Sequence, residues 1–198
     1  MKKNENGNNC LMYAINNINI EIVRLLIDYA NKNDIVLKIN EKNNDGDYLL
    51  LLATNNDNIE IIRFLIDYAN KNNIILEINE KDNDGLCSII EATTMINIEI
   101  IKLLIDYSNG SKNITILNII DSAINGWYAL LYATFINNIE IINIFIENAD
   151  KNNITLKINE KNENGDYPLW FAIYNNNIEM VKLLINNADK NKYRIGNR

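Results

Sequence analysis

The chain has 198 residues, of which 47% are apolar, so it is long enough for one domain and has enough hydrophobic side chains for a core. Its formal charge of −7 excludes the basic surface that nucleic-acid binding requires, and the absence of histidine removes the commonest general base and transition-metal ligand. The two cysteines form no CxxC pair and no apolar run suits a signal peptide or membrane span, so we expect a soluble cytoplasmic protein without metal or cofactor.

One unit of about 39 residues repeats along the chain. Five glycines mark the unit, with steps of 39, 39, 41 and 39 residues between them. The triplet Asn-Ile-Glu and an alanine recur with the same steps. The sequence therefore predicts a single domain, 1–198, with repeats at approximately 4–42, 43–81, 82–122, 123–161 and 162–198. The glycines are Gly7, Gly46, Gly85, Gly126 and Gly165.

Each unit predicts two helices, the first directly after the glycine and the second over a stretch such as 58–72, where apolar residues have helical spacing. Asn58 is expected to cap the second helix through its side-chain oxygen. Glu60 follows in the first turn, where the helix dipole favours a negative charge. Arg63 and Asp67 lie four residues apart and are expected to pair. We therefore interpret the recurring glutamates as structural rather than catalytic.

An alternating run follows the second helix and predicts an extended, strand-like connection. In the second repeat this run is Ile74, Leu76 and Ile78, which has the two-residue period of a strand. A turn comes next, in which the glycine is expected to take a positive φ. The connection between the third and fourth repeats is two residues longer and breaks the alternation.

The order of helix, turn, helix and finger resembles the ankyrin repeat. The resemblance rests on KDNDG (81–85), GDYPLWFA (165–172) and NIEMVKLLI (177–185). These stretches are similar to the family's turn, its first-helix signature Thr-Pro-Leu-His-Leu-Ala and its second-helix Leu-Glu-Val-Val-Lys-Leu-Leu-Leu. The resemblance covers essentially the whole chain and implies an all-α repeat solenoid, a stack of five helix-turn-helix units with elongated hairpin-like fingers.

The chain departs from the family pattern at two positions of the first helix. Only Pro168 keeps the family's proline. The signature histidine, which hydrogen-bonds between repeats in the family, is replaced by apolar residues, so we expect stacking to depend on apolar packing. Both ends look polar enough to cap the stack, which favours a monomer, although a fragment of a longer array is an open alternative. The residues in the histidine position are Met12, Leu51, Ile90, Leu131 and Trp170.

The stretch GLCSIIEATTM (85–95) places a thiol, a hydroxyl and a carboxylate close together, at Cys87, Ser88 and Glu91. A nucleophilic site needs a base beside the nucleophile, and without histidine Glu91 is the only nearby candidate. We interpret the stretch as structural and expect no catalytic residue in it. Glu91 occupies a position that resembles a packed one in the family. It therefore reaches the rim or meets a tyrosine hydroxyl or a backbone amide, or else it is exposed in the groove as a contact residue.

Partner binding is expected where apolar residues replace polar ones in the middle repeats. The resemblance implies that finger-tip and first-helix positions line a concave face that recognises a protein or an extended peptide. Exposed apolar clusters mark such sites, and tryptophan is a frequent hot-spot residue. The alternative is that the longer finger covers this cluster as a satellite core. The apolar candidates are Leu86, Met95, Trp127, Phe135, Ile136 and Tyr174, and the acidic ones, which favour a partner with basic residues, are Asp47, Glu91 and Asp166.

Three classes of function remain on the sequence alone. The first is a non-enzymatic protein-interaction module, to which neither nucleic acid nor membrane binds. The second is a structural or targeting segment of a larger protein. The third and most remote is an enzyme that would build its site from carboxylates and tyrosines, because the sequence has no glycine-rich phosphate loop and no metal-ligand spacing.

Overall fold

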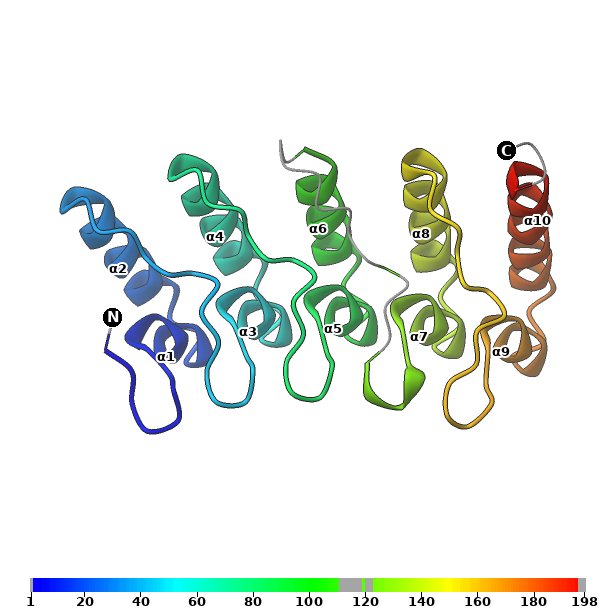
Figure 1. The fold of residues 1–198 in the computed structure, drawn as a ribbon, viewed down its shortest axis with the longest axis horizontal. Helices are drawn as coiled ribbons and strands as arrows, with labels where there is room; N and C mark the ends of the chain where they lie inside the picture. The colour runs from blue at the N-terminus through cyan, green and yellow to red at the C-terminus, as the bar shows by residue number, and fades with distance from the viewer. Residues whose placement is uncertain (1, 111–118, 120–122, 196–198) are drawn as a thin grey trace. The chain divides into compact units, whose positions relative to one another are not determined.

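The computed structural model describes residues 2–110, 119 and 123–195, and in these ranges each repeat forms a shorter first helix beside a longer second helix (Figure 1). The chain divides into two compact units, Met1–Leu117 and Asn118–Arg198. The first unit contains α1 (Cys10–Asn16), α2 (Ile20–Lys32), α3 (Leu49–Asn55), α4 (Ile59–Lys71), α5 (Ser88–Thr94) and α6 (Ile98–Gly110). The second contains the 3₁₀ helix η1 (Ile124–Gly126), α7 (Ala129–Phe135), α8 (Ile139–Asn152), α9 (Pro168–Tyr174) and α10 (Ile178–Ile195).

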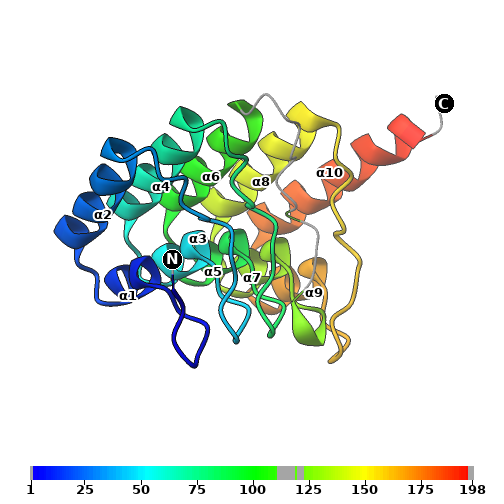
Figure 2. The ribbon, with the colours of Figure 1, turned by 60° about the vertical axis from the view of Figure 1, so that its left-hand side comes forward.

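Within the first unit, neighbouring repeats pack first helix to first helix and second helix to second helix. Helix α3 contacts both α1 and α5, and α4 contacts both α2 and α6. Figure 2 shows the second helices α2, α4 and α6 in one row and the first helices α1, α3 and α5 in another. In the second unit α9 packs on α7 in the same way. The side chains between the two rows form the core.

The predicted asparagine caps are confirmed at every second helix. The Asn58 side-chain oxygen accepts a hydrogen bond from the backbone N–H of Ile61 at 3.0 Å, and Glu60 lies in the first turn of α4. This bond satisfies one of the amide groups that a helix N-terminus leaves unpaired. The equivalent caps are Asn19, Asn97, Asn138 and Asn177.

The turn glycines have positive φ, as predicted, and three of them, Gly7, Gly46 and Gly126, also allow close approach of the next repeat. Gly46 has φ +84°, and a Cβ atom built there would lie 2.7 Å from the backbone nitrogen of Asn83. The same two turns are joined by a hydrogen bond from the Asn83 N–H to the Asp45 carbonyl at 3.0 Å. Only glycine combines this backbone conformation with this contact.

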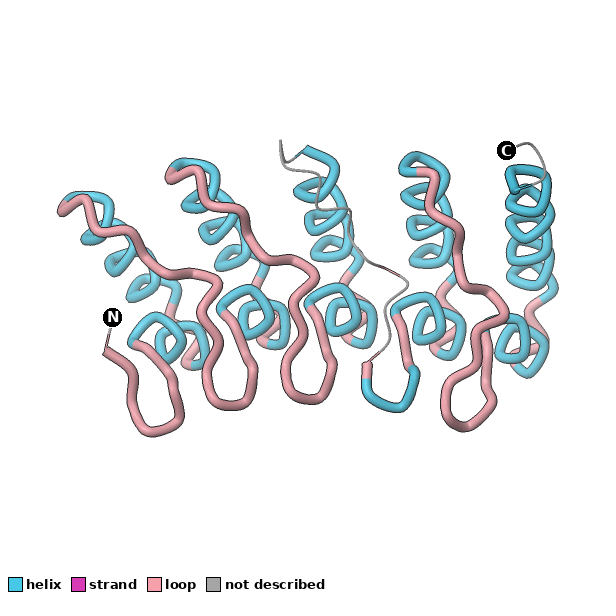
Figure 3. The backbone as a smooth tube through the Cα atoms, viewed as in Figure 1, coloured by secondary structure: helices cyan, strands magenta, loops and turns pink. Residues whose placement is uncertain are grey.

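The extended connections of the described residues form loops and not strands, in agreement with an all-α repeat (Figure 3). The alternation instead records burial: Leu76 and Ile78 are buried and Glu77 between them is exposed. Alternating burial does not require a paired strand. The backbone groups of the first connection find a different partner, the hydroxyl of Tyr68 on α4.

The residues in the position of the missing histidine pack through apolar side chains, as expected, in four of the five repeats. Met12, Leu51 and Ile90 are buried in the first unit, and Leu131 is buried in the second. Only Trp170 of this set is exposed.

The expected pair of Arg63 with Asp67 is replaced by a contact between repeats. The Arg63 guanidinium lies 3.3 Å from the Glu99 carboxylate in the next repeat, and Arg24 makes the equivalent contact to Glu60 at 3.2 Å. Glu99 of the next repeat therefore lies closer to the Arg63 guanidinium than Asp67 of the same helix does. This supports a structural role for these glutamates.

The first repeat does not end in a polar surface, contrary to the expectation that both ends cap the stack. Ile22, Leu25 and Tyr29 of α2 are exposed, whereas the equivalent Ile61 and Tyr68 of α4 are buried. The expected C-terminal cap, 189–198, lies outside the residues whose side chains the structure describes. Among the helices of 2–110 and 123–195, none combines the length and apolar character needed to cross a membrane.

Candidate interaction site

The thiol and hydroxyl of the GLCSIIEATTM stretch are structural. Cys87 and Ser88 are both buried. The Ser88 and Tyr48 hydroxyls lie 3.2 Å apart, and the Tyr48 hydroxyl donates to the Glu80 carbonyl at 2.8 Å. Burial raises the pKa of the Tyr48 hydroxyl, so it remains a neutral donor. These contacts hold the start of α5 against the preceding repeat and leave no access for a substrate.

The Glu91 side chain is half-buried, and no described residue forms a hydrogen bond with its carboxylate. Desolvation raises its pKa, and the nearby negative charge of Asp82 raises it further. A carboxylate in this state gains from any cation that approaches it. Of the two interpretations of Glu91, this environment agrees better with a contact residue.

Asp82 was missed by the sequence analysis, and it adds a second carboxylate near Glu91. It occupies the turn position held by Asn43 in the second repeat and, like Asn43, accepts two backbone hydrogen bonds, here from Asp84 and Leu86 at 2.9 and 2.8 Å. Burial raises the pKa of Asp82, and the charges of Asp84 and Asp47 also raise it. The carboxylate in place of the asparagine that the first, second and fifth repeats have at this turn position was the sequence signal that could have identified it.

The other predicted partner-binding residues of the first unit are half-buried or exposed. Asp47 is half-buried and accepts a hydrogen bond from the Asn43 side chain at 3.0 Å. Leu86 is half-buried, and its backbone N–H donates a hydrogen bond to the Asp82 carboxylate. Met95 at the C-terminus of α5 is exposed. We call Asp47, Asp82 and Glu91 the acidic group.

In the second unit the predicted residues belong to a continuous group of aromatic rings. The Trp127 ring centroid lies 4.6 Å from that of Tyr132, 5.5 Å from that of Phe135 and 5.8 Å from that of Phe171. The Phe135 and Phe171 rings are themselves 5.2 Å apart. These distances fall in the range of favourable ring pairs. Trp127 on the turn thus joins the first helices of two consecutive repeats.

The group continues along α9. The Trp170 ring lies 5.1 Å from Phe171 and stacks on Tyr174, also at 5.1 Å. Phe135 is 52% exposed and Tyr174 is exposed, whereas Phe171 is buried beneath them. We call the six rings the aromatic cluster: Trp127, Tyr132, Phe135, Phe171, Trp170 and Tyr174.

The remaining predicted residues of the second unit lie outside the ring contacts. Ile136 is half-buried at the C-terminus of α7. Asp166 is half-buried and accepts a hydrogen bond from the Asn162 side chain at 3.1 Å. The longer finger that was expected to cover the cluster, 111–118 and 120–122, lies outside the described residues. Phe135 is 52% exposed.

Three rings of the aromatic cluster were missed by sequence reasoning. Tyr132 and Phe171 share a first-helix position with Glu91 and were interpreted as packed, and Trp170 was seen only as a replacement for the signature histidine. Their proximity to Trp127 depends on how consecutive repeats pack. The available signal was the concentration of aromatic residues in the last two repeats.

Comparison with known proteins agrees with this architecture. A family model described as "Ankyrin repeats (3 copies)" matches residues 34–116 and 108–194, and one described as "Ankyrin repeat" matches 6–36. A crystal structure of an ankyrin repeat domain from Acinetobacter baumannii AYE is 22% identical, with a TM-score of 0.71 over 94% of this chain and 85% of that chain. No curated protein sequence matches. The predicted all-α repeat solenoid is confirmed.

Proposed function

Since this chain belongs to the ankyrin repeat family, we propose that it is a non-enzymatic module that binds a protein or an extended peptide through its finger-tip and first-helix positions. Ankyrin repeats are generally protein–protein interaction modules. The observation that carries the proposal is the aromatic cluster, in which Phe135 and Tyr174 stand exposed over buried Phe171. Exposed rings on a rigid base offer contact area at a low entropic cost.

The acidic group supports a partner with basic residues. Asp82 and Glu91 have pKa values raised mainly by burial, so a lysine or arginine placed beside them would restore favourable interactions that water no longer provides. The net charge of −7 would also favour the approach of a cationic segment. The proposed partner therefore presents apolar side chains to the aromatic cluster and a basic residue to the acidic group.

Two other classes of function have less support. A purely structural or targeting segment would not need exposed rings at Phe135 and Tyr174. An enzyme would require an accessible reactive group, but Cys87 and Ser88 are buried. Tyr48, the hydroxyl beside Ser88, has its pKa raised by burial and is a poor base.

Affinity capture from a native lysate with two baits tests the proposal. One bait is the wild type, and the other carries Trp127→Ala, Phe135→Ala and Tyr174→Ala. We expect a saturable partner that is captured by the wild type, lost by the triple variant and released by moderate salt. Its identification by mass spectrometry then allows a direct binding measurement, in which Glu91→Gln should weaken affinity about tenfold or less, as for a partly exposed charge.

A matched control bait carries Val36→Ala and Ile75→Ala, two exposed apolar residues of the connections that lie outside the aromatic cluster and the acidic group. Circular dichroism checks that all baits are folded. If the triple variant captures the same proteins as the wild type, the aromatic cluster is not the binding surface and the proposal is wrong.

A further inference from the structure

The second helix of the first repeat exposes the residues that later repeats use to pack against the repeat before them. Ile22 is 46% exposed, whereas the equivalent Ile61 of α4 is fully buried. Tyr29 is exposed, whereas the equivalent Tyr68 is buried with its hydroxyl hydrogen-bonded to the connection of the first repeat. The same side-chain types thus lie on an open surface in one repeat and in a repeat interface in the next.

Leu25 completes this surface. Its equivalent in the second repeat, Phe64, lies under the Arg24 guanidinium of the repeat before, with 5.1 Å between the guanidinium carbon and the ring centroid. Leu25 is exposed on α2. Three positions that face the preceding repeat are therefore uncovered together. We call Ile22, Leu25 and Tyr29 the entry face.

The last repeat exposes the opposite set, the residues that earlier repeats use to pack against the repeat after them. Ile185 of α10 is 44% exposed, whereas the equivalent Ile66 of α4 is 9% exposed. On the first helix Trp170 and Ile173 are exposed, although their equivalents are buried in all four earlier repeats. We call Trp170, Ile173 and Ile185 the exit face.

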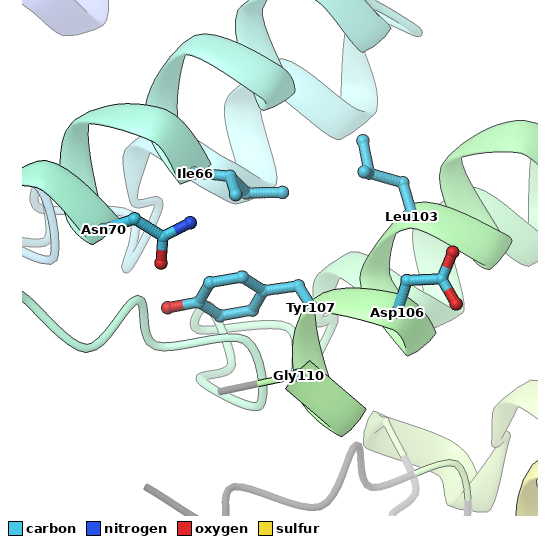
Figure 4. Close-up of a pocket in the computed structure, with 6 residues that line it drawn as sticks. All are labelled: Ile66, Asn70, Leu103, Asp106, Tyr107 and Gly110. Atoms are coloured by element: carbon cyan, nitrogen blue, oxygen red, sulfur yellow. The ribbon is translucent and has the colours of Figure 1, made fainter. Parts of the chain in front are cut away.

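The contact between the second and third repeats shows how such faces fit. Figure 4 shows Ile66 of α4 across a pocket of about 210 Å³ from Leu103 and Tyr107 of α6. Ile66 is equivalent to Ile185 on the exit face, and Leu103 and Tyr107 are equivalent to Leu25 and Tyr29 on the entry face. The Tyr107 hydroxyl accepts a hydrogen bond from the backbone N–H of Leu76, so this contact is specific as well as apolar.

The charges beside the two faces are also complementary. Between the first and second repeats Arg24 and Glu60 form an ion pair at 3.2 Å, and an equivalent pair joins the second and third repeats. The residue equivalent to Arg24 beside the exit face is Lys182, and the residue equivalent to Glu60 beside the entry face is Glu21. Both are exposed, and within the described part of the chain neither has an ion-pair partner. A junction of the two faces would supply each with the partner that its equivalents have.

We propose that copies of this chain associate head to tail, with the entry face of one copy packed on the exit face of another. Ile185 then lies against Leu25 and Tyr29, and Lys182 pairs with Glu21. The contact joins unlike surfaces, so a pair of copies keeps one free entry face and one free exit face and can add a further copy at either end. This departs from the monomer expected on the sequence, because the exposed face of α2 is apolar.

Light scattering coupled to gel filtration, over a range of protein concentrations, tests the association. We expect the measured mass of the wild type to increase from 22.8 kDa towards multiples of that mass as the protein concentration increases. Leu25→Asp and Ile185→Asp should each remain monomeric, because each removes one side of the junction. Ile75→Asp, at an exposed position of a connection, is the matched control and should associate as the wild type does.

A mixture of the two monomeric variants identifies the geometry. The Leu25→Asp copy keeps an intact exit face and the Ile185→Asp copy keeps an intact entry face, so the mixture should form dimers of one copy of each and nothing larger. The charge pair is tested by Glu21→Lys and Lys182→Glu, which should each weaken association and together restore it.

Two results would overturn the proposal. One is a wild type that stays at 22.8 kDa at every concentration, in which case the entry face is available to some other protein. The other is dimerisation of Ile185→Asp alone, which would show a symmetric contact between two entry faces. Substitution of Phe135 should leave the association unchanged, so this test and that of partner binding fail independently.

Discussion

The hydroxyl of Tyr68 accepts a hydrogen bond from the backbone N–H of Leu37 at 2.8 Å, and so joins α4 to the connection of the preceding repeat. The same hydroxyl donates to the Ile35 carbonyl at 3.2 Å. One side chain thus satisfies two backbone groups of a loop that has no strand partner. Buried backbone groups without partners are strongly disfavoured, so this contact explains how the loop is tolerated against the helices.

Tyr68→Phe should therefore destabilise the fold although it removes a single oxygen atom. The buried N–H of Leu37 would lose its acceptor, with an expected loss of about 1–3 kcal/mol in the free energy of unfolding. Tyr29→Phe is the matched control. Tyr29 is exposed in the first repeat, so this substitution should change the free energy of unfolding little. Urea unfolding followed by circular dichroism measures both. Equal effects of the two substitutions would contradict this account.

Alanine substitution of two glycines should have opposite effects. Gly46 has φ +84° and its Cβ would lie 2.7 Å from the Asn83 backbone, so Gly46→Ala should lower stability by more than about 1 kcal/mol. Gly110 is the last residue of α6, and a Cβ there would meet no atom within 4 Å. Gly110→Ala should leave stability unchanged or raise it by up to about 1 kcal/mol. Thermal unfolding of the two variants beside the wild type tests the difference.

The raised pKa of Glu91 predicts a specific pH dependence. Between its ordinary pKa of 4.5 and its raised pKa the folded state holds the proton more tightly than the unfolded state, so stability should fall as the pH rises through this range. Glu91→Gln should reduce that fall and be more stable than the wild type at neutral pH. Glu77→Gln, at an exposed position, is the control. Unfolding curves at several pH values measure how the free energy of unfolding changes with pH. An unchanged dependence in Glu91→Gln would show that other groups cause it.

The two thiols should differ in reactivity. Cys10 is exposed at the start of α1, and Cys87 is buried beside α5. A thiol reagent should modify Cys10 rapidly in the native protein and reach Cys87 only when the repeat opens. Mass spectrometry after timed labelling measures both rates, and addition of denaturant should make them equal. Rapid native labelling of Cys87 would show that its repeat opens readily.

Local signals explain why much of the fold could be predicted. The glycine spacing located the turns, and the recurring asparagine located the start of each second helix, because positive φ and side-chain capping depend on neighbouring residues in the chain. Asp82 could also have been identified locally, from the carboxylate that replaces the asparagine of the equivalent turn. The extended connection shows the limit, since the alternation was visible in the sequence but the contact of this loop with Tyr68 was not.

The sequence by itself determined the repeat, the order of its helices and the apolar character of the stacking. Only the tertiary structure decided which equivalent residues are covered: Ile61 is buried, whereas its equivalent Ile22 is exposed. It also decided that Arg63 pairs with Glu99 and that Trp127 meets Phe171. Such contacts join residues about 36 to 44 positions apart, so they depend on how folded repeats pack, which no local pattern in the chain specifies.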